Sequence, residues 1–253
     1  MRTIAIANQK GGCGKTTTAV NISAALAELG NRVLIIDLDP QGHATLGLGL
    51  NPGNLDKTIG DALSKVRTPL AEGITKTNVQ GLNLVPSNIL LSGVELQLAG
   101  LYGREYILSQ QLSTLNDRYD ICIIDCSPSL SLLTLNALVA STEVLVPVQV
   151  HYYALEGLKQ LLKTISIVKK RFNPRLKLLG ILLTLVESRM LMSRQIQRQM
   201  RKFFGKMVFD VVIHRTIRLA EAPSTGQSVL TYAPNCMGAL EYRALAEEIS
   251  NGK

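Results

Sequence analysis

The sequence predicts an α/β protein with a doubly wound, mostly parallel sheet and helices on both of its faces. Short, continuously apolar runs alternate with longer segments of helical periodicity along the 253 residues, which is the order that parallel strands with crossover helices require. Two of these runs end in an acidic residue, and ligands of such sheets bind where the strands end. No repeat or linker interrupts the pattern, so residues 1–253 are expected to form one domain.

Seven apolar runs have the length and composition of buried strands. They are Ile4–Ala7, Arg32–Asp37, Leu82–Val85, Tyr119–Asp125, Glu143–Val148, Leu176–Leu185 and Val208–Ile213. Helical spacing covers Thr17–Leu29, Ile59–Ser64, Leu90–Leu101, Tyr106–Leu115, Leu130–Ala140, Leu155–Phe172 and Met192–Phe204. The glycine-rich segment Pro40–Gly53 is expected to be a loop.

A glycine-rich turn between the first strand and the first helix carries the clearest chemical signal. Its residues are Lys10, Gly11, Gly12, Cys13, Gly14, Lys15, Thr16 and Thr17. Glycines let successive backbone N–H groups converge on anionic oxygens, and the helix that follows adds its own N-terminal donors. The turn is therefore expected to bind a nucleotide polyphosphate, with Lys15 at the β- and γ-phosphates and Thr16 on Mg²⁺.

Acidic residues near strand ends are the expected partners of that turn. Asp125 closes an apolar run and is expected to hold Mg²⁺ through its shell of water, while Asp39 follows the strand that ends at Asp37. Hydrolysis needs a group that orients the attacking water, and Asp39 is the candidate for it. A helix cap or a surface carboxylate is the alternative for either acid. Asp37 is expected to have a structural or metal-shell part.

The turn departs from the common phosphate loop, because Gln9 stands where that pattern has glycine and Lys10 is an additional lysine. It resembles the deviant Walker A box of the ParA/MinD family of P-loop ATPases, and within that family the ParA/Soj partitioning ATPases. The matching segments, in order, also include Asp37–Gly42, Ile121–Asp125 and Arg218–Pro223. The resemblance covers nearly the whole chain.

The resemblance implies a P-loop ATPase fold and a Mg²⁺-dependent enzyme that hydrolyses ATP to ADP and phosphate. It also implies a homodimer that forms with ATP, in which Lys10 contacts the nucleotide of the facing subunit. Asp39 would activate the hydrolytic water and Asp125 would be the Walker B acid. Non-specific double-stranded DNA, a ParB-like centromere-binding protein that stimulates hydrolysis, and a role in chromosome or plasmid segregation follow from the same resemblance. Four positions depart from the family: His43, Cys126, Ser127 and His214.

Positive charge is concentrated in the last two-fifths of the chain. Residues 151–253 hold 17 Lys and Arg against 7 Asp and Glu, whereas residues 1–150 hold 10 against 12. Such asymmetry indicates that one part of the molecule meets a polyanion. The candidate DNA-binding residues are Arg189, Arg194, Arg198, Arg201, Arg215 and Arg218, of which the resemblance matches Arg189 and Arg218. A charge for solubility and a solvated helix face are the alternatives.

The predicted helix that carries three of these arginines is amphipathic. Arg194, Arg198 and Arg201 fall at i, i+4 and i+7, so they share one face. The apolar residues of the opposite face, which is expected to dock on the core, are Ile196, Met200, Phe203 and Phe204. Ser193 is expected to be the N-cap.

Two other functions remain open from the sequence. A membrane-cycling ATPase of the MinD type would end in a basic amphipathic helix, but the last residues here include the adjacent Glu247 and Glu248. An iron–sulfur reductase would need exposed thiolates, whereas Cys122 lies in a predicted buried strand and Cys126 directly follows Asp125. The chain has no leader and no apolar run of about 18 residues, so it is expected to be cytoplasmic and, by resemblance, associated with the nucleoid.

Overall fold

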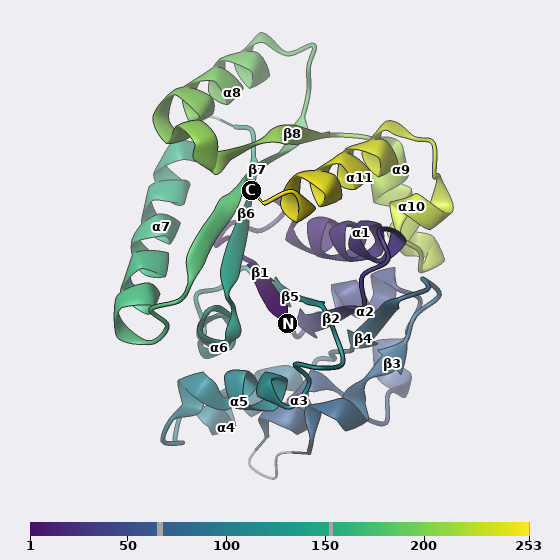
Figure 1. Ribbon diagram of the computed structural model, residues 1–253, viewed down its shortest axis with the longest axis vertical. Coiled ribbons are helices and arrows are strands. Elements are labelled where there is room, and N and C mark those ends of the chain that lie inside the picture. The colour runs from purple at the N-terminus through teal and green to yellow at the C-terminus, as the bar shows by residue number, and fades with distance from the viewer. Residues whose placement is uncertain (65–67, 152–153, 253) are drawn as a thin grey trace.

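A twisted sheet covered by helices on both faces forms the centre of the molecule (Figure 1). The computed structural model describes residues 1–64, 68–151 and 154–252. The strands are β1 (Arg2–Ile6), β2 (Val33–Leu38), β3 (Thr75–Lys76), β4 (Leu82–Val85), β5 (Ile121–Cys126), β6 (Glu143–Gln149), β7 (Lys177–Val186) and β8 (Val208–His214). All seven predicted strands are present, with ends that differ from the prediction by at most two residues.

The strand order is β3-β4-β2-β5-β1-β6-β7-β8. Every neighbouring pair is parallel except β3 and β4, so one edge of the sheet collects the carboxyl ends of seven strands. All residues of β2 and β5 are buried, because both faces of a parallel sheet are covered. The doubly wound, mostly parallel fold expected from the sequence is confirmed.

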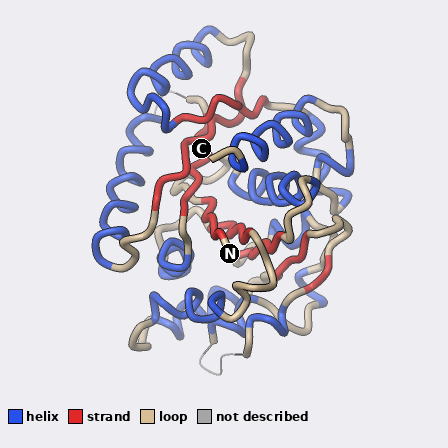
Figure 2. The backbone as a smooth tube through the Cα atoms, viewed as in Figure 1, coloured by secondary structure: helices blue, strands red, loops and turns tan. Residues whose placement is uncertain are grey.

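Two hydrophobic cores lie on the two faces of the sheet. The helices are α1 (Lys15–Glu28), α2 (His43–Gly47), α3 (Ile59–Leu63), α4 (Leu91–Leu98), α5 (Ile107–Ser113), α6 (Leu132–Ala140), α7 (Ala154–Arg171), α8 (Leu191–Phe204), α9 (Ile217–Glu221), α10 (Val229–Tyr232) and α11 (Met237–Ser250). Helices α1, α10 and α11 pack on one face, whereas α3 to α8 supply the other core (Figure 2).

The expected loop at Pro40–Gly53 is wrong in part, because it contains α2 and the short turn Pro52–Asn54. A tertiary contact explains the helix: the buried Asp37 carboxylate accepts hydrogen bonds from the backbone N–H and the hydroxyl of Thr45, at 2.8 and 2.7 Å. Five residues show too little periodicity to predict such a helix from sequence. The helices α9, α10 and α11 also went unpredicted.

Helix α11 is anchored in the core rather than extending as a tail. Its buried residues include Tyr242, Leu245 and Ile249, and the Tyr242 and Thr18 hydroxyls lie 3.3 Å apart. The Glu248 carboxylate accepts the backbone N–H groups of Asp210 and Val211 on β8. The apolar face of α11 is thus occupied by the protein itself.

Candidate nucleotide-binding site

The glycine-rich turn leaves β1 at the carboxyl edge of the sheet and leads directly into α1. Gly12 and Gly14 have φ angles of 70° and 84°, which glycine adopts without steric cost. The Thr184 hydroxyl on β7 donates to the Cys13 carbonyl oxygen at 2.8 Å, and the Asn8 side chain donates to the carbonyl of Pro147 at 2.6 Å. Contacts with β6 and β7 therefore hold the turn in place.

The two lysines of the turn differ in their surroundings. The Lys15 side chain is buried, with 7% exposure, and its ammonium donates to the Lys10 carbonyl oxygen at 3.0 Å. Lys10 is exposed, and its ammonium donates to Gln149 on β6 at 3.2 Å. Lys15 thus lies under the turn where phosphates would be bound, whereas Lys10 faces outward. Cys13 is packed, and burial raises the pKa of its thiol.

Asp37 and Asp125 lie side by side on β2 and β5, as register partners. Asp37 is fully hydrogen-bonded: Thr45 donates to one oxygen, and the Asp39 backbone N–H donates to the other at 3.2 Å. Burial raises the Asp37 pKa to about 6 in spite of these bonds. Its structural part is therefore to hold the segment that follows β2.

Asp125 differs from Asp37 in its hydrogen bonding. It is completely buried, yet neither carboxylate oxygen has a hydrogen-bond partner among the residues that the structure describes. Burial, and then the charge of Asp37, raise the Asp125 pKa well above its ordinary value. The nearby Thr16 hydroxyl and the positive charge of Lys15 lower this pKa, but by less. A buried carboxylate without a partner is costly unless something else compensates for its charge.

This unpaired carboxylate fits a divalent cation. Oxygen ligands suit Mg²⁺, which retains several waters and is held by one or two protein groups together with phosphate oxygens. Asp125 and the Thr16 hydroxyl, which both lie near the buried end of the turn, are the residues that would hold it. The Asp39 carboxylate lies beside this position with 9% exposure, and one of its oxygens accepts the Gln41 backbone N–H at 2.9 Å. His43 is exposed at the start of α2.

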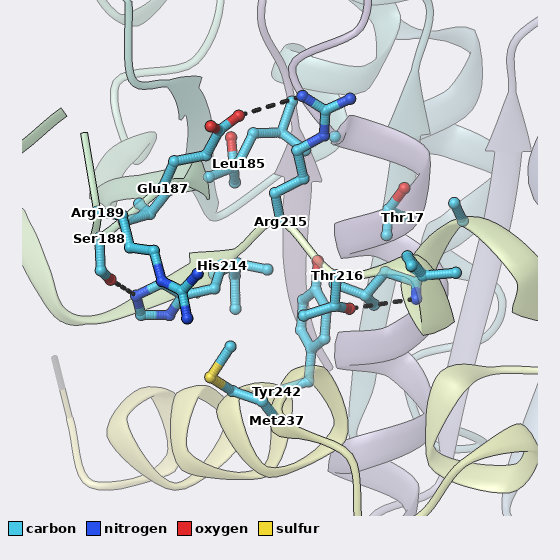
Figure 3. Close-up of a pocket in the computed structure, with 17 residues that line it drawn as sticks. Thr17, Leu185, Glu187, Ser188, Arg189, His214, Arg215, Thr216, Met237 and Tyr242 are labelled. Carbon is cyan, nitrogen blue, oxygen red and sulfur yellow. Dashed lines mark hydrogen bonds and ion pairs between the residues drawn. The ribbon is translucent and has the colours of Figure 1, made fainter. Parts of the chain in front are cut away.

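A cavity of about 800 Å³ opens next to the turn, within the size range of ligand pockets (Figure 3). It extends from Gly14 and Thr17 to the ends of β7 and β8 and to α11. Leu185, in its lining, has a φ angle of 52°, which non-glycine residues rarely adopt. Such backbone outliers cluster at functional sites. A nucleoside attached to phosphates on the turn has room in this cavity.

His214 connects three parts of the cavity wall. Its Nδ1 lies 2.5 Å from a Glu241 carboxylate oxygen, and its Nε2 lies 2.7 Å from the Ser188 hydroxyl. In the sequence, His214 stands out only as a departure from the family, and nothing distinguishes Ser188, Glu241 or Thr184. No motif marks these residues, because the contacts join positions far apart in the chain.

The six candidate arginines do not lie together: several are near the carboxyl edge of the sheet, whereas Arg201 is near the opposite edge. Arg189 and Arg215 line the cavity, and Arg218 follows on α9. Because α8 crosses back between the parallel strands β7 and β8, its first turn, with Arg194, lies at the carboxyl edge. Arg201, near the other end of α8, binds Asp210 at 3.5 Å.

Two details expected of α8 are wrong. Met190 is its N-cap, and Ser193 is buried inside the helix, where its hydroxyl oxygen lies 3.4 Å from the Glu187 backbone nitrogen. Ile196 and Met200 are buried as expected, but Phe203 is 65% exposed. Phe204, the last residue of the helix, is partly buried against the core. Arg194 and Arg198 are exposed.

Two of the cavity-side arginines form ion pairs with nearby glutamates. Arg215 binds Glu187 at 3.1 Å, and Arg218 binds Glu221 at 2.9 Å. All four side chains remain at least 41% exposed, so these pairs are weak and can be exchanged for other anions.

Comparisons with known proteins agree with this geometry. The family model described as an AAA domain matches residues 1–178. The sporulation initiation inhibitor protein Soj of Bacillus subtilis is 45% identical over 247 residues, covering 98% of this chain and 97% of that protein. The chromosome partitioning protein ParA of Myxococcus xanthus is 46% identical over 248 residues, covering 98% and 87%.

A solved structure from Mycobacterium smegmatis, described as cobyrinic acid a,c-diamide synthase with bound ATP analogue and magnesium, superposes with a TM-score of 0.88. It is 39% identical and covers 99% of this chain and 95% of that one. The phosphate-binding turn, the buried acid at its base and the full-length similarity to Soj and ParA lead to one conclusion: this chain belongs to the ParA/Soj family of P-loop ATPases.

Proposed function

We propose that this protein is a partitioning ATPase that binds ATP and Mg²⁺, dimerises with ATP, binds DNA without sequence preference and releases it on hydrolysis. The observation that carries the nucleotide part is the buried Lys15 at the turn next to the buried, unpaired Asp125. A cationic and an anionic group, both desolvated at one helix N-terminus, suit a magnesium-bound polyphosphate. The family's Soj and ParA members support the cellular role.

The chain's own residues divide the reaction between them. Lys15 binds the β- and γ-phosphates, and Asp125 holds the metal through water. Asp39, fixed by the Gln41 N–H, orients a water toward the γ-phosphate. Magnesium, when bound, neutralises charge on the phosphate oxygens as the bond to the leaving group breaks.

A dimer through the carboxyl edge of the sheet is part of the proposal. Lys10 is exposed at this edge and is held by Gln149, so it can extend to a nucleotide on a facing subunit. The apolar side chains of Ile89, Leu90 and Leu130, which follow β4 and β5 at the same edge, are 63%, 72% and 44% exposed. Exposed apolar residues grouped beside a functional site favour a protein contact. Assembly of the dimer would then depend on the γ-phosphate, which hydrolysis removes.

DNA binding is assigned to the arginines near the carboxyl edge, namely Arg189, Arg194, Arg215 and Arg218. Two subunits joined at this edge would bring two such patches to one duplex and roughly double the phosphate contacts. Binding through phosphates carries no sequence information and weakens as salt is raised. We further propose that a ParB-like protein stimulates a slow intrinsic ATPase, which can be tested by adding the basic N-terminal segment of such a protein and measuring phosphate release.

The experiment that tests the proposal measures the binding of random-sequence duplex DNA with ATP, ADP or no nucleotide, alongside light scattering. The expected result is a dimer and a DNA complex with ATP alone. DNA binding that is equally strong with ATP, with ADP and without nucleotide would contradict the proposed dependence on ATP. Sedimentation with anionic liposomes and ATP tests the MinD-type alternative, which α11 disfavours because its apolar face is buried. None of the described helices is long and apolar enough to cross a membrane.

The cysteines of this protein disfavour two further functions. A diamide synthase, as the M. smegmatis neighbour is described, would need a source of ammonia, and a cysteine nucleophile for glutamine hydrolysis requires an accessible thiolate. Cys13, Cys122 and Cys126 are buried, and the Cys236 sulfur caps α11 by accepting the Ala239 N–H. The same burial disfavours an iron–sulfur cluster shared between subunits.

A further inference from the structure

Glu241, His214 and Ser188 form a hydrogen-bonded chain from α11 across the end of β8 to the loop after β7. Figure 3 shows the Ser188 end of this chain at the cavity rim, where both Ser188 and His214 belong to the lining. The side chains of His214 and Glu241 are 24% and 14% exposed. The chain is therefore mostly shielded from water and ends at a hydroxyl that faces the cavity.

The direction of the first hydrogen bond is determined by chemistry. One Glu241 oxygen accepts the His214 backbone N–H at 2.9 Å, and the other lies 2.5 Å from His214 Nδ1. An ionised carboxylate can only accept hydrogen bonds. In the neutral imidazole, the proton is therefore on Nδ1, and Nε2 holds a lone pair.

That lone pair determines the orientation of Ser188. The serine hydroxyl donates its single proton to Nε2 at 2.7 Å, so the remaining lone pairs of its oxygen are what the cavity meets. Two other hydroxyls along the lining are engaged within the protein, since Thr184 donates to Cys13 and Tyr242 lies in hydrogen-bond distance of Thr18. Ser188 is a fixed acceptor rather than a freely rotating hydroxyl.

We propose that the Glu241–His214–Ser188 chain makes the cavity select a nucleobase that presents an amino group, such as adenine, over one that presents a keto oxygen, such as hypoxanthine. Ser188 is the contact residue, and His214 and Glu241 are positioning residues. An amino group donates to the Ser188 oxygen, whereas a keto oxygen faces it lone pair to lone pair. The inference rests on the proposed function, in which the cavity holds the base.

The test compares the dissociation constants of ATP, ITP and purine riboside triphosphate, measured by competition against a fluorescent ADP. ITP replaces the 6-amino group by a keto oxygen, and purine riboside lacks any group there. Wild-type protein is expected to bind ATP about tenfold or more tightly than either, because both analogues leave the Ser188 oxygen without a donor once the bound base covers it.

Two substitutions change the opposite ends of the hydrogen-bonded chain from Glu241 to Ser188. Ser188→Ala removes the acceptor from an exposed loop, so the fold is retained and the three affinities should converge. In Glu241→Gln, the amide oxygen still accepts the His214 backbone N–H, and the amide NH₂ then donates to Nδ1. The imidazole proton moves to Nε2, which donates to Ser188 and turns its O–H toward the cavity. Glu241→Gln should therefore bind ITP at least as tightly as ATP.

Glu248→Gln is the matched control, because Glu248 also lies on α11 and accepts backbone N–H groups of β8, but it does not line this cavity. It should keep the wild-type ratio. Equal wild-type affinity for ATP and ITP, or a ratio unchanged in both Ser188→Ala and Glu241→Gln, would overturn the inference while leaving the ATPase assignment in place. Wild-type protein that binds none of the three nucleotides would overturn the proposed function itself.

Discussion

The ammonium of Lys15 lies 3.0 Å from the backbone oxygen of Lys10, so the second lysine of the turn is folded under the first. The Lys10 side chain points the other way, to Gln149. One turn therefore holds one buried cation and one exposed cation. This difference allows the two lysines to be separated by experiment.

Lys15→Ala should weaken ATP binding by about tenfold to a hundredfold, because a charged hydrogen bond to phosphate is lost. The far-ultraviolet circular dichroism spectrum should not change, since the Lys15 side chain is not part of either hydrophobic core. Lys10→Ala is the matched control at the other lysine: monomers should bind ATP normally but fail to dimerise. Calorimetric titration and light scattering measure the two properties, and ATPase activity that survives Lys15→Ala would be incompatible with the site.

Asp39→Ala should retain ATP and stop its hydrolysis, because the carboxylate is placed to orient water rather than to bind phosphate. The ATP dimer is then expected to persist, as is its complex with DNA. Light scattering with ATP over several hours distinguishes this result from simple loss of assembly. A variant that stays monomeric in ATP would show that Asp39 is needed for binding instead.

Asp125→Asn should raise the free energy of unfolding of the nucleotide-free protein by about 1 kcal/mol at neutral pH, because a neutral amide replaces a buried carboxylate without a partner. Magnesium-dependent hydrolysis should be lost at the same time. Asp120→Asn is the control, since Asp120 is an exposed acid paired with Arg32 at 2.7 Å, and its loss should change stability by less than about 1 kcal/mol. Urea unfolding of both variants measures the difference.

Arg218→Glu should abolish DNA binding and leave ATP binding and dimerisation intact, because α9 lies outside the phosphate turn. Arg189→Glu should weaken binding, and each lost phosphate contact should lower the salt slope by about one. Arg201→Glu is expected to have the smallest effect, since Arg201 is paired with Asp210 near the opposite edge of the sheet.

Glu221→Gln offers the reverse change. It removes the ion-pair partner of Arg218 and should strengthen DNA binding several-fold at low salt. Gel-shift titrations at three salt concentrations cover the whole set. Dimers of Arg218→Glu that still shift DNA like wild type would assign the basic surface to another purpose.

The elements that sequence analysis predicted well are those with a local cause. The turn from Lys10 to Thr17 and the strands that lead to Asp37 and Asp125 combine a continuous apolar run with a chemically distinctive end, so neighbouring residues suffice to recognise them. The functional roles of these residues, and those of the arginines, stay predictions. The α2 helix was missed because Thr45 is held by Asp37, eight residues away. Ser193 is buried inside α8 instead of capping it.

The sequence by itself determined the glycine-rich turn, the succession of strands along the chain and the excess of positive charge near the C-terminus, because glycine spacing, apolar periodicity and charge are properties of short segments. Only the tertiary structure decided that Asp125 is unpaired, that Arg201 faces Asp210, and that Ser188, His214 and Glu241 meet at one cavity. Those facts depend on which distant segments share a sheet edge, and hydrogen bonds between them form only after the hydrophobic cores have brought the segments together.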